Sequence, residues 1–259
     1  MADKSYHELT DKEWKIVERK LPPAKSKGRP QTDNRLALNG ILWVMKSGAP
    51  WRFLPSKYGK WNSVYKKFRQ WASAGIFENL MPRHKDYGEI LAMDSTFCKV
   101  HRHALGARKN APGHETNQNI DSSRGGKTTK IHILVDENFR VVKFLLSAGN
   151  VNDNLLALPL LKGFNLKNKV VLADKAYSTA KIRDYLEKQG ALVCIPDKVN
   201  AKVKHDFDRQ LYKKRNVVER FFCRLKDYLR ITIRLDKLSS SFSSFVCLAI
   251  FLLSQRVCH

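Results

Sequence analysis

Four side chains near the C-terminus have types and spacing suited to handling a phosphodiester: Tyr212, Arg215, Glu219 and Lys226. On an α-helix, their offsets of 0, 3, 7 and 14 residues place all four within an arc of about 60°. A carboxylate between two basic groups and a phenol would present a metal-binding acid to a phosphate. The alternative is the solvated face of a basic helix, which has the same pattern.

Two further acids stand where strands of a sheet would carry them. Asp94 lies inside an apolar run that predicts a central strand, where an ionised carboxylate is costly to bury unless it is paired or binds a metal. Asp174 directly follows the apolar residues 170–173, which would deliver it to the C-terminal edge of the sheet. Taken alone, Asp94 could be a buried structural acid that is hydrogen-bonded to a partner. Asp174 taken alone could be a turn or cap residue. Together with Glu219 they form three oxygen ligands, a set that suits Mg²⁺ or Mn²⁺ and not zinc.

The spacing of apolar residues, which predicts the helices and strands that position these side chains, changes along the chain. Residues 1–80 have helical spacing, which starts with a capping box at Thr10 and Glu13. From residue 89 the spacing is that of strands, and then of alternating helices and strands. The predicted helices are about 33–45, 62–74, 153–161, 179–189 and 211–229, with a buried C-terminal helix at 245–253; the predicted strands are 90–100, 130–135, 141–146, 169–173 and 191–195; the serine cluster 239–244 is predicted as a loop.

This order predicts an α/β fold, a ribonuclease-H-like mixed sheet with flanking helices, preceded by a small helical N-terminal domain. We expect the domains to be residues 1–85 and 86–259, with the strands of Asp94 and Asp174 as neighbours in the sheet. The first domain has 18 Lys or Arg against 7 Asp or Glu, which favours a helix-turn-helix-like DNA-binding module. A small trihelical packing unit would have a similar pattern.

Composition limits the partners and the cellular compartment. The chain has 259 residues, of which 43% are hydrophobic, and a formal net charge of +24, so we expect a folded core and a polyanionic partner. An acidic membrane surface is the rival, but neither a basic amphipathic anchor nor an apolar run of about 18 residues supports it. Five cysteines without CxxC spacing, and an N-terminus without an apolar signal region, favour the cytoplasm.

At this point the chain resembles bacterial DDE transposases of insertion-sequence family 5, within the group that shares the signature Tyr-x2-Arg-x3-Glu-x6-Lys. Residues 212, 215, 219 and 226 match every fixed position of that signature. Two departures are Ala176, where relatives commonly have Gly, and an interval from Asp174 to Glu219 that is too short for the β-insertion of some relatives. Other similar blocks are Ser-Gly-Ala-Pro-Trp-Arg at 47–52, Tyr-Gly-Lys-Trp at 58–61, Met-Asp-Ser-Thr at 93–96, Ser-Arg-Gly-Gly at 123–126, Thr-Lys-Ile-His at 129–132 and Ala-Asp-Lys-Ala-Tyr at 173–177.

The resemblance implies that Asp94, Asp174 and Glu219 form a catalytic triad that holds two Mg²⁺ ions, with Mn²⁺ as a substitute. It implies that Arg215 and Lys226 contact phosphates near the scissile bond. Tyr212 would stack on or hydrogen-bond to the terminal nucleotides. The implied function is binding of terminal inverted repeats, cleavage of donor DNA and joining of the 3′-OH ends to target DNA, by at least a homodimer on DNA. Two alternatives stay open: a catalytically silent DNA-binding regulator or decayed copy, and a ribonuclease-H-like nuclease that cleaves without joining.

Overall fold

The computed structural model describes residues 8–22, 32–81, 87–107 and 118–256. The chain divides into two compact units, each assembled from segments that are distant in the sequence. The prediction assigned DNA binding to residues 1–85 and catalysis to residues 86–259. This assignment of functions stays a prediction. The first unit consists of Met1–Met81, Val100–Gln118 and Leu225–Gln255, and the second of Pro82–Lys99, Asn119–Arg224 and Arg256–His259.

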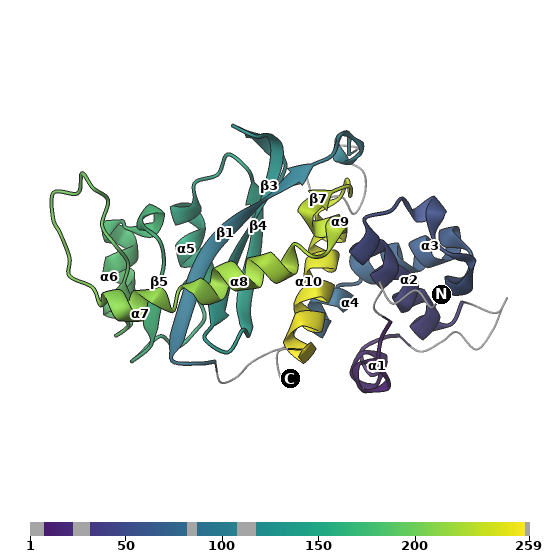
Figure 1. Ribbon diagram of the computed structural model, residues 1–259, viewed down its shortest axis with the longest axis horizontal. Helices are drawn as coiled ribbons and strands as arrows, with labels where there is room; N and C mark the ends of the chain where they lie inside the picture. Colours follow the sequence, from purple (N-terminus) through teal and green to yellow (C-terminus); the bar gives the residue numbers. More distant parts are fainter. Residues whose placement is uncertain (1–7, 23–31, 82–86, 108–117, 257–259) are drawn as a thin grey trace. The chain divides into compact units, whose positions relative to one another are not determined.

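The first unit is mainly helical (Figure 1). Its first helix begins with the predicted capping box: Thr10 Oγ1 accepts the Glu13 N–H at 3.2 Å, and Glu13 Oε2 accepts the Thr10 N–H at 2.8 Å. This reciprocal pair satisfies two of the four N–H groups that a helix start leaves open. The elements of this unit are α1 Asp11–Glu18, α2 Asn34–Ser47, η1 Trp51–Phe53, η2 Ser56–Tyr58, α3 Trp61–Ser73, α4 Ile76–Leu80, η3 Arg102–Ala104, α9 Leu229–Thr232, β7 Ile233–Arg234 and α10 Ser239–Arg256.

The C-terminal helix α10 is the core of the first unit. The predicted buried helix 245–253 is confirmed, and Phe245 stacks on Phe68 of α3 with ring centroids 4.6 Å apart. The predicted loop at 239–244 is wrong, because these residues form the first turns of α10. Their hydroxyls find partners within the helix and outside it: Ser244 Oγ donates to Ser240 O at 2.8 Å, and Ser241 Oγ accepts from Arg69 at 2.7 Å. None of the described helices is long and apolar enough to cross a membrane.

The second unit is built on a mixed sheet, as predicted. β3 pairs antiparallel with β1 on one side, and on the other with β4, its predicted hairpin partner, and with the short β2, which was not predicted. β1 then pairs in parallel with β5, and β5 in parallel with β6. The elements are β1 Ile90–Val100, β2 Asp121–Ser123, β3 Gly126–Asp136, β4 Val141–Ala148, α5 Asp153–Leu161, β5 Val170–Leu172, η4 Lys175–Tyr177, α6 Ala180–Lys188, β6 Leu192–Cys194, α7 Arg209–Lys213 and α8 Asn216–Leu225.

Helices flank this sheet, which completes the predicted ribonuclease-H-like α/β class. Leu91 and Met93 of β1 belong to a buried apolar cluster with residues of α5 and α6. Because side chains alternate along a strand, Asp94 leaves β1 on the opposite face. There α8 runs across β1 (Figure 1), and the Phe221 ring of α8 lies 6.2 Å from that of Phe139.

Gly48 ends α2 in the left-handed conformation, with φ of +66°. A Cβ at this position would lie 2.9 Å from Leu229 Cβ, closer than side chains pack. We expect Gly48→Ala to lower the free energy of unfolding by more than the roughly 1–2 kcal/mol that left-handed backbone alone costs. Urea unfolding followed by tryptophan fluorescence measures the loss.

The control is Gly75→Ala, with a matching φ of +67° and only the end of the flexible Glu78 side chain, at 3.9 Å, near the added carbon. It should show the backbone cost alone. Equal losses in the two variants would contradict the clash with Leu229.

Candidate active site

Asp94 lies inside β1, and Asp174 follows the end of β5, the strand that pairs with β1 in parallel. The last paired residues of β1 and β5 are Ala92 and Leu172. Each aspartate stands two residues further along its strand direction, so the two carboxylates point to the same face. The predicted adjacency of these two strands is confirmed, and it brings together two acids that are 80 residues apart in the chain.

Asp94 is a half-buried acid in a crowded electrostatic environment, with a side chain that is 21% exposed. Burial raises the pKa of its carboxyl group above the ordinary value, and the nearby charge of Asp174 adds to that rise. The Ser95 N–H, which donates to Asp94 Oδ1 at 2.8 Å, and the Arg215 guanidinium act in the opposite direction. A cation placed between these two neighbouring carboxylates would offset the repulsion between their charges.

Asp174 caps the short turn that follows β5. Its Oδ1 accepts the N–H of Ala176 at 2.8 Å, which starts the turn η4. Ala176 is not among the residues with positive φ, so alanine fits the position where relatives commonly have glycine. That departure from the family pattern leaves the position of Asp174 unaffected.

The predicted single helix 211–229 is wrong. α7 ends at Lys213 and α8 begins at Asn216. In between, N–H groups donate to carbonyls three residues back, Arg215 to Tyr212 at 2.9 Å and Val218 to Arg215 at 3.1 Å. Arg215 lies in this break and contacts Asp94 of β1. The segment contains no proline or glycine that would have predicted the break.

Arg215 joins two of the predicted acids. Its Nη1 donates to Asp94 Oδ2 at 2.8 Å, and its Nη2 forms a short ion pair with Glu219 Oε1. The Arg215 side chain is 16% exposed and that of Glu219 is 52% exposed. The guanidinium therefore anchors the start of α8 to the middle of the sheet and holds Glu219 on the side of Asp94.

The donor set suits a hard divalent cation, but its three acids are not gathered around one point. Among the described residues, no group of three His, Cys, Asp or Glu side chains is placed to hold a metal ion. Carboxylate oxygens are the ligands that Mg²⁺ and Mn²⁺ prefer, and Asp94 and Asp174 supply them side by side. The positive charge between Asp94 and Glu219 belongs to Arg215, which would have to release Glu219 for this third acid to join them.

Tyr212 lies next to Arg215, whereas Lys226 lies beyond the end of α8. The Arg215 guanidinium is 5.8 Å from the centre of the Tyr212 ring, and burial raises the pKa of the Tyr212 hydroxyl. Lys226 is exposed and belongs to the first unit, where its carbonyl accepts the Thr232 hydroxyl at 2.6 Å. The roles of both residues on DNA stay predictions.

A cavity of about 520 Å³ adjoins Asp174 and has three lysines in its lining, Lys130, Lys175 and Lys198. Lys130 Nζ is paired with Asp153 Oδ1 at 2.8 Å. Neither Lys175 nor Lys198 has an acidic partner among the described residues. Sequence reasoning did not identify these lysines as site residues. Lys130 could have been found by the pattern that identified Asp94, which is a charged side chain inside a buried strand.

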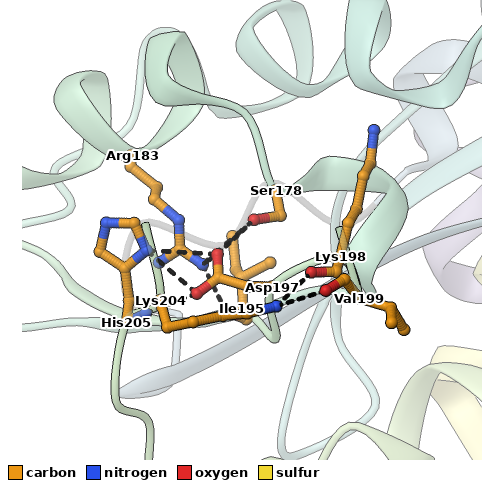
Figure 2. Close-up of polar contacts among 8 residues, drawn as sticks. All are labelled: Ser178, Arg183, Ile195, Asp197, Lys198, Val199, Lys204 and His205. Carbon is orange, nitrogen blue, oxygen red and sulfur yellow. Dashed lines mark hydrogen bonds and ion pairs between the residues drawn. The ribbon is translucent and has the colours of Figure 1, made fainter. Parts of the chain in front are cut away.

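The wall of this cavity that carries Lys198 is held by a buried ion pair (Figure 2). Arg183 Nη2 donates to Asp197 Oδ1 at 2.9 Å, and both side chains are 7% exposed. Ser178 Oγ donates to the same oxygen at 2.9 Å, and the His205 ring lies 3.1 Å from the other. Lys204 then closes the loop by donating to the carbonyls of residues 198 and 199.

These contacts decide the charge state of Asp197. Burial alone would raise the pKa of its carboxyl group. The His205 N–H, the Ser178 hydroxyl and the charge of Arg183 outweigh burial and hold the pKa well below the usual range. Asp197 is therefore ionised at neutral pH and serves to fix the loop.

Known protein families match almost all of the described chain. Residues 9–81 match the family described as "Putative transposase of IS4/5 family", and residues 87–253 match "Transposase DDE domain". The second match spans more than half of the sequence and includes Asp94, Asp174 and Glu219.

Individual relatives match shorter stretches of the chain. "Uncharacterized protein y4sN" of Sinorhizobium fredii is 36% identical over 106 residues, 39% of this chain and 83% of the relative. "Putative transposase for insertion sequence element IS6501" of Brucella ovis is 32% identical over 130 residues, 47% of this chain and 94% of the relative. The solved structure "Mos1 transposase paired-end complex with left transposon end" aligns with 80% of this chain and 82% of its own at 12% identity, but the TM-score of 0.28 is too low to carry an argument.

We expect Asp197→Ala to lower the free energy of unfolding by about 3–5 kcal/mol, because it leaves Arg183 buried without its partner. A carboxyl group whose pKa is lowered by folding stabilises the protein above its unfolded pKa, about 3.9, and loses that contribution as the pH falls toward the folded pKa. The difference between wild type and variant should therefore shrink below about pH 4. Urea unfolding at neutral and acidic pH measures it.

Asp184→Ala is the matched control, since Asp184 is exposed on α6. It should change stability by no more than about 0.5 kcal/mol. A stability difference for Asp197→Ala that is the same at neutral pH and at about pH 2.5 would contradict the ion pair.

Proposed function

Because the chain belongs to the DDE transposases of the IS4/5 family, we propose that Asp94, Asp174 and Glu219 carry its chemistry. Enzymes of this family cleave and join DNA strands and use divalent metal ions. The observation that supports the assignment is the placement of Asp94 and Asp174 on adjacent parallel strands, with Arg215 linking Asp94 to Glu219.

We propose two Mg²⁺ ions, with Mn²⁺ as a substitute, as the cations that these acids hold. Bound there, they would stabilise negative charge on the attacking and leaving oxygens at phosphorus. The role of the protein is to present the three carboxylates from β1, from the turn after β5 and from α8, and to exchange the Arg215 ion pairs for contacts to phosphate. A guanidinium suits both partners, since its planar N–H groups match carboxylate and phosphate oxygens equally well.

The remaining basic groups are proposed to bind the DNA backbone. Lys175 and Lys198 line the cavity beside Asp174 without acidic partners in the described chain, which suits them to phosphate contacts. Tyr212 is proposed to contact the terminal nucleotides, and Lys226 a phosphate near the scissile bond. A phenol ring stacks on bases of any sequence, so this contact would recognise the end of a strand and not its sequence.

The proposed substrates are the terminal inverted repeats of an insertion sequence and the target DNA into which its 3′-OH ends are joined. Bringing two ends together calls for at least a homodimer on DNA, and the cytoplasm is the compartment in which the chain would meet both. Residues 1–81 and 225–255 share one unit, so recognition of the repeats by the N-terminal helices is better tested by point substitutions than by deletion.

We expect Asp94→Asn to reduce strand cleavage of supercoiled donor DNA by at least about 100-fold, since the replaced oxygen is a proposed metal ligand. Binding of the same DNA in the presence of a chelator should be retained. The exposed Asp184→Asn is the control, with unchanged cleavage. Cleavage by Asp94→Asn at the wild-type rate would exclude Asp94 from the chemistry. Cleavage without joining by the wild type would favour the nuclease alternative. DNA binding without cleavage by the wild type would favour the silent regulator.

Arg215→Gln should bind Mn²⁺ more tightly than wild type, because it removes a positive charge that competes for Asp94 and Glu219. A unit charge at about 4 Å is worth roughly 1–4 kcal/mol at dielectric constants between those of bulk water and a protein surface, which corresponds to an affinity about fivefold tighter or more. Electron paramagnetic resonance of free Mn²⁺ measures the affinity. Arg209→Gln, at an exposed position of α7, is the control. Equal Mn²⁺ affinity in Arg215→Gln and wild type would show that Arg215 does not compete with the metal.

A further inference from the structure

The first unit contains a cavity of about 560 Å³ that the proposed chemistry does not use. Pro50, Trp51 and Arg52 line it, and they belong to the Ser-Gly-Ala-Pro-Trp-Arg block at residues 47–52. The volume lies within the range of small-molecule sites, about 300–1,000 Å³, and is too small for a base-paired duplex. Its residues are those expected around a single nucleotide.

Aromatic rings form part of the cavity wall. Trp51 packs against Tyr65 with ring centroids 5.3 Å apart, and both rings line the cavity. Trp61 lines it as well, remains 36% exposed, and has the Arg52 guanidinium 5.7 Å from its ring centre. An exposed indole with a guanidinium over it offers a stacking surface for a planar, electron-rich ring.

Positively charged side chains outnumber negatively charged ones in the lining of the cavity. Its acid, Asp236, is occupied by Arg230, which donates to both carboxylate oxygens at 3.0 and 2.9 Å in a buried pair. Arg52, Arg69 and Lys237 have no acidic partner among the described residues. Arg69 is oriented by its hydrogen bond to Ser241 Oγ at 2.7 Å. These cations leave the cavity suited to an anionic ligand.

We propose that this cavity binds one unpaired nucleotide of a DNA strand, with the base against the Trp61 ring and the adjoining phosphates on Arg52 and Arg69. Stacking surfaces and guanidinium groups within one cavity match the two parts of a nucleotide, and the net charge of +24 matches the polyanion that carries it. An acidic peptide would satisfy the cations and leave the aromatic wall without a planar partner. The proposal rests on the proposed function only in taking DNA as the ligand.

The test compares two labelled DNA duplexes that are identical except for one unpaired nucleotide, a single-base bulge, in the second. Fluorescence anisotropy of the full-length chain in the presence of a chelator reports binding without cleavage. We expect wild type to bind the bulged duplex more tightly. Trp61→Ala should lose this preference, by a factor of roughly 5–150, while keeping its affinity for the paired duplex.

Conservative and matched variants separate stacking from folding. Trp61→Phe keeps an aromatic ring and should retain most of the preference, and Arg52→Ala should reduce the salt dependence of binding by about one phosphate contact. The controls are Phe53→Ala, 71% exposed and outside the cavity lining, and Arg19→Ala, exposed at the end of α1. Circular dichroism verifies that each variant folds.

Equal affinity of wild type for both duplexes, or an undiminished preference in Trp61→Ala, would overturn the proposal. Displacement of the bulged duplex by polyglutamate but not by a short oligothymidylate would assign the cavity to acidic peptides and would also overturn it. Asp94→Asn should keep the preference for the bulged duplex. If Asp94→Asn cleaves DNA normally while the preference persists, the proposed catalytic role fails and the nucleotide site stands. If Asp94→Asn is inactive and wild type shows no preference, the catalytic role stands and the nucleotide site fails.

Discussion

An acid placed inside a strand is the constraint around which the second unit is organised. Asp94 is half-buried, and removing an ionised carboxylate from water is costly unless a positive partner compensates its charge. Asp94 obtains its partner from Arg215, which is 121 residues away in the chain. Arg215 lies in the break between α7 and α8, and it contacts both Asp94 of β1 and Glu219 of α8. The helix break, the ion pair with Asp94 and the orientation of Glu219 all meet at Arg215.

The same physical device appears at two other places, each time to hold an irregular segment. Arg183 with Asp197 fixes the loop beside Asp174, and Arg230 with Asp236 fixes the chain before α10. Both pairs are nearly excluded from water, so each charge is tolerated only while its partner is present. In both places the buried pair of an arginine and an aspartate holds an irregular segment of the chain in position.

Several elements could be predicted because they depend on local pattern. The capping box at Thr10 and Glu13, the hairpin of β3 and β4, and the parallel neighbours β1 and β5 follow from side-chain types and from the rules of strand order. The prediction of a loop at the serine cluster 239–244 was wrong, because serine disfavours a helix only when its hydroxyl competes for backbone hydrogen bonds. Here Arg69 and the helix itself satisfy those hydroxyls, and burial against α3 decides the conformation.

The sequence by itself determined the class of sheet, the position of Asp94 inside a strand and of Asp174 just after one, and the polyanionic partner, because alternation, helical period and net charge are properties of neighbouring residues or of the whole composition. Only the tertiary structure decided that Arg215 stands between Asp94 and Glu219, that α10 forms one unit with the N-terminal helices, and that Trp51 and Trp61 line a basic cavity. These facts depend on contacts between residues far apart in the chain, and such contacts are selected by the burial of whole surfaces, which leaves no local pattern to detect.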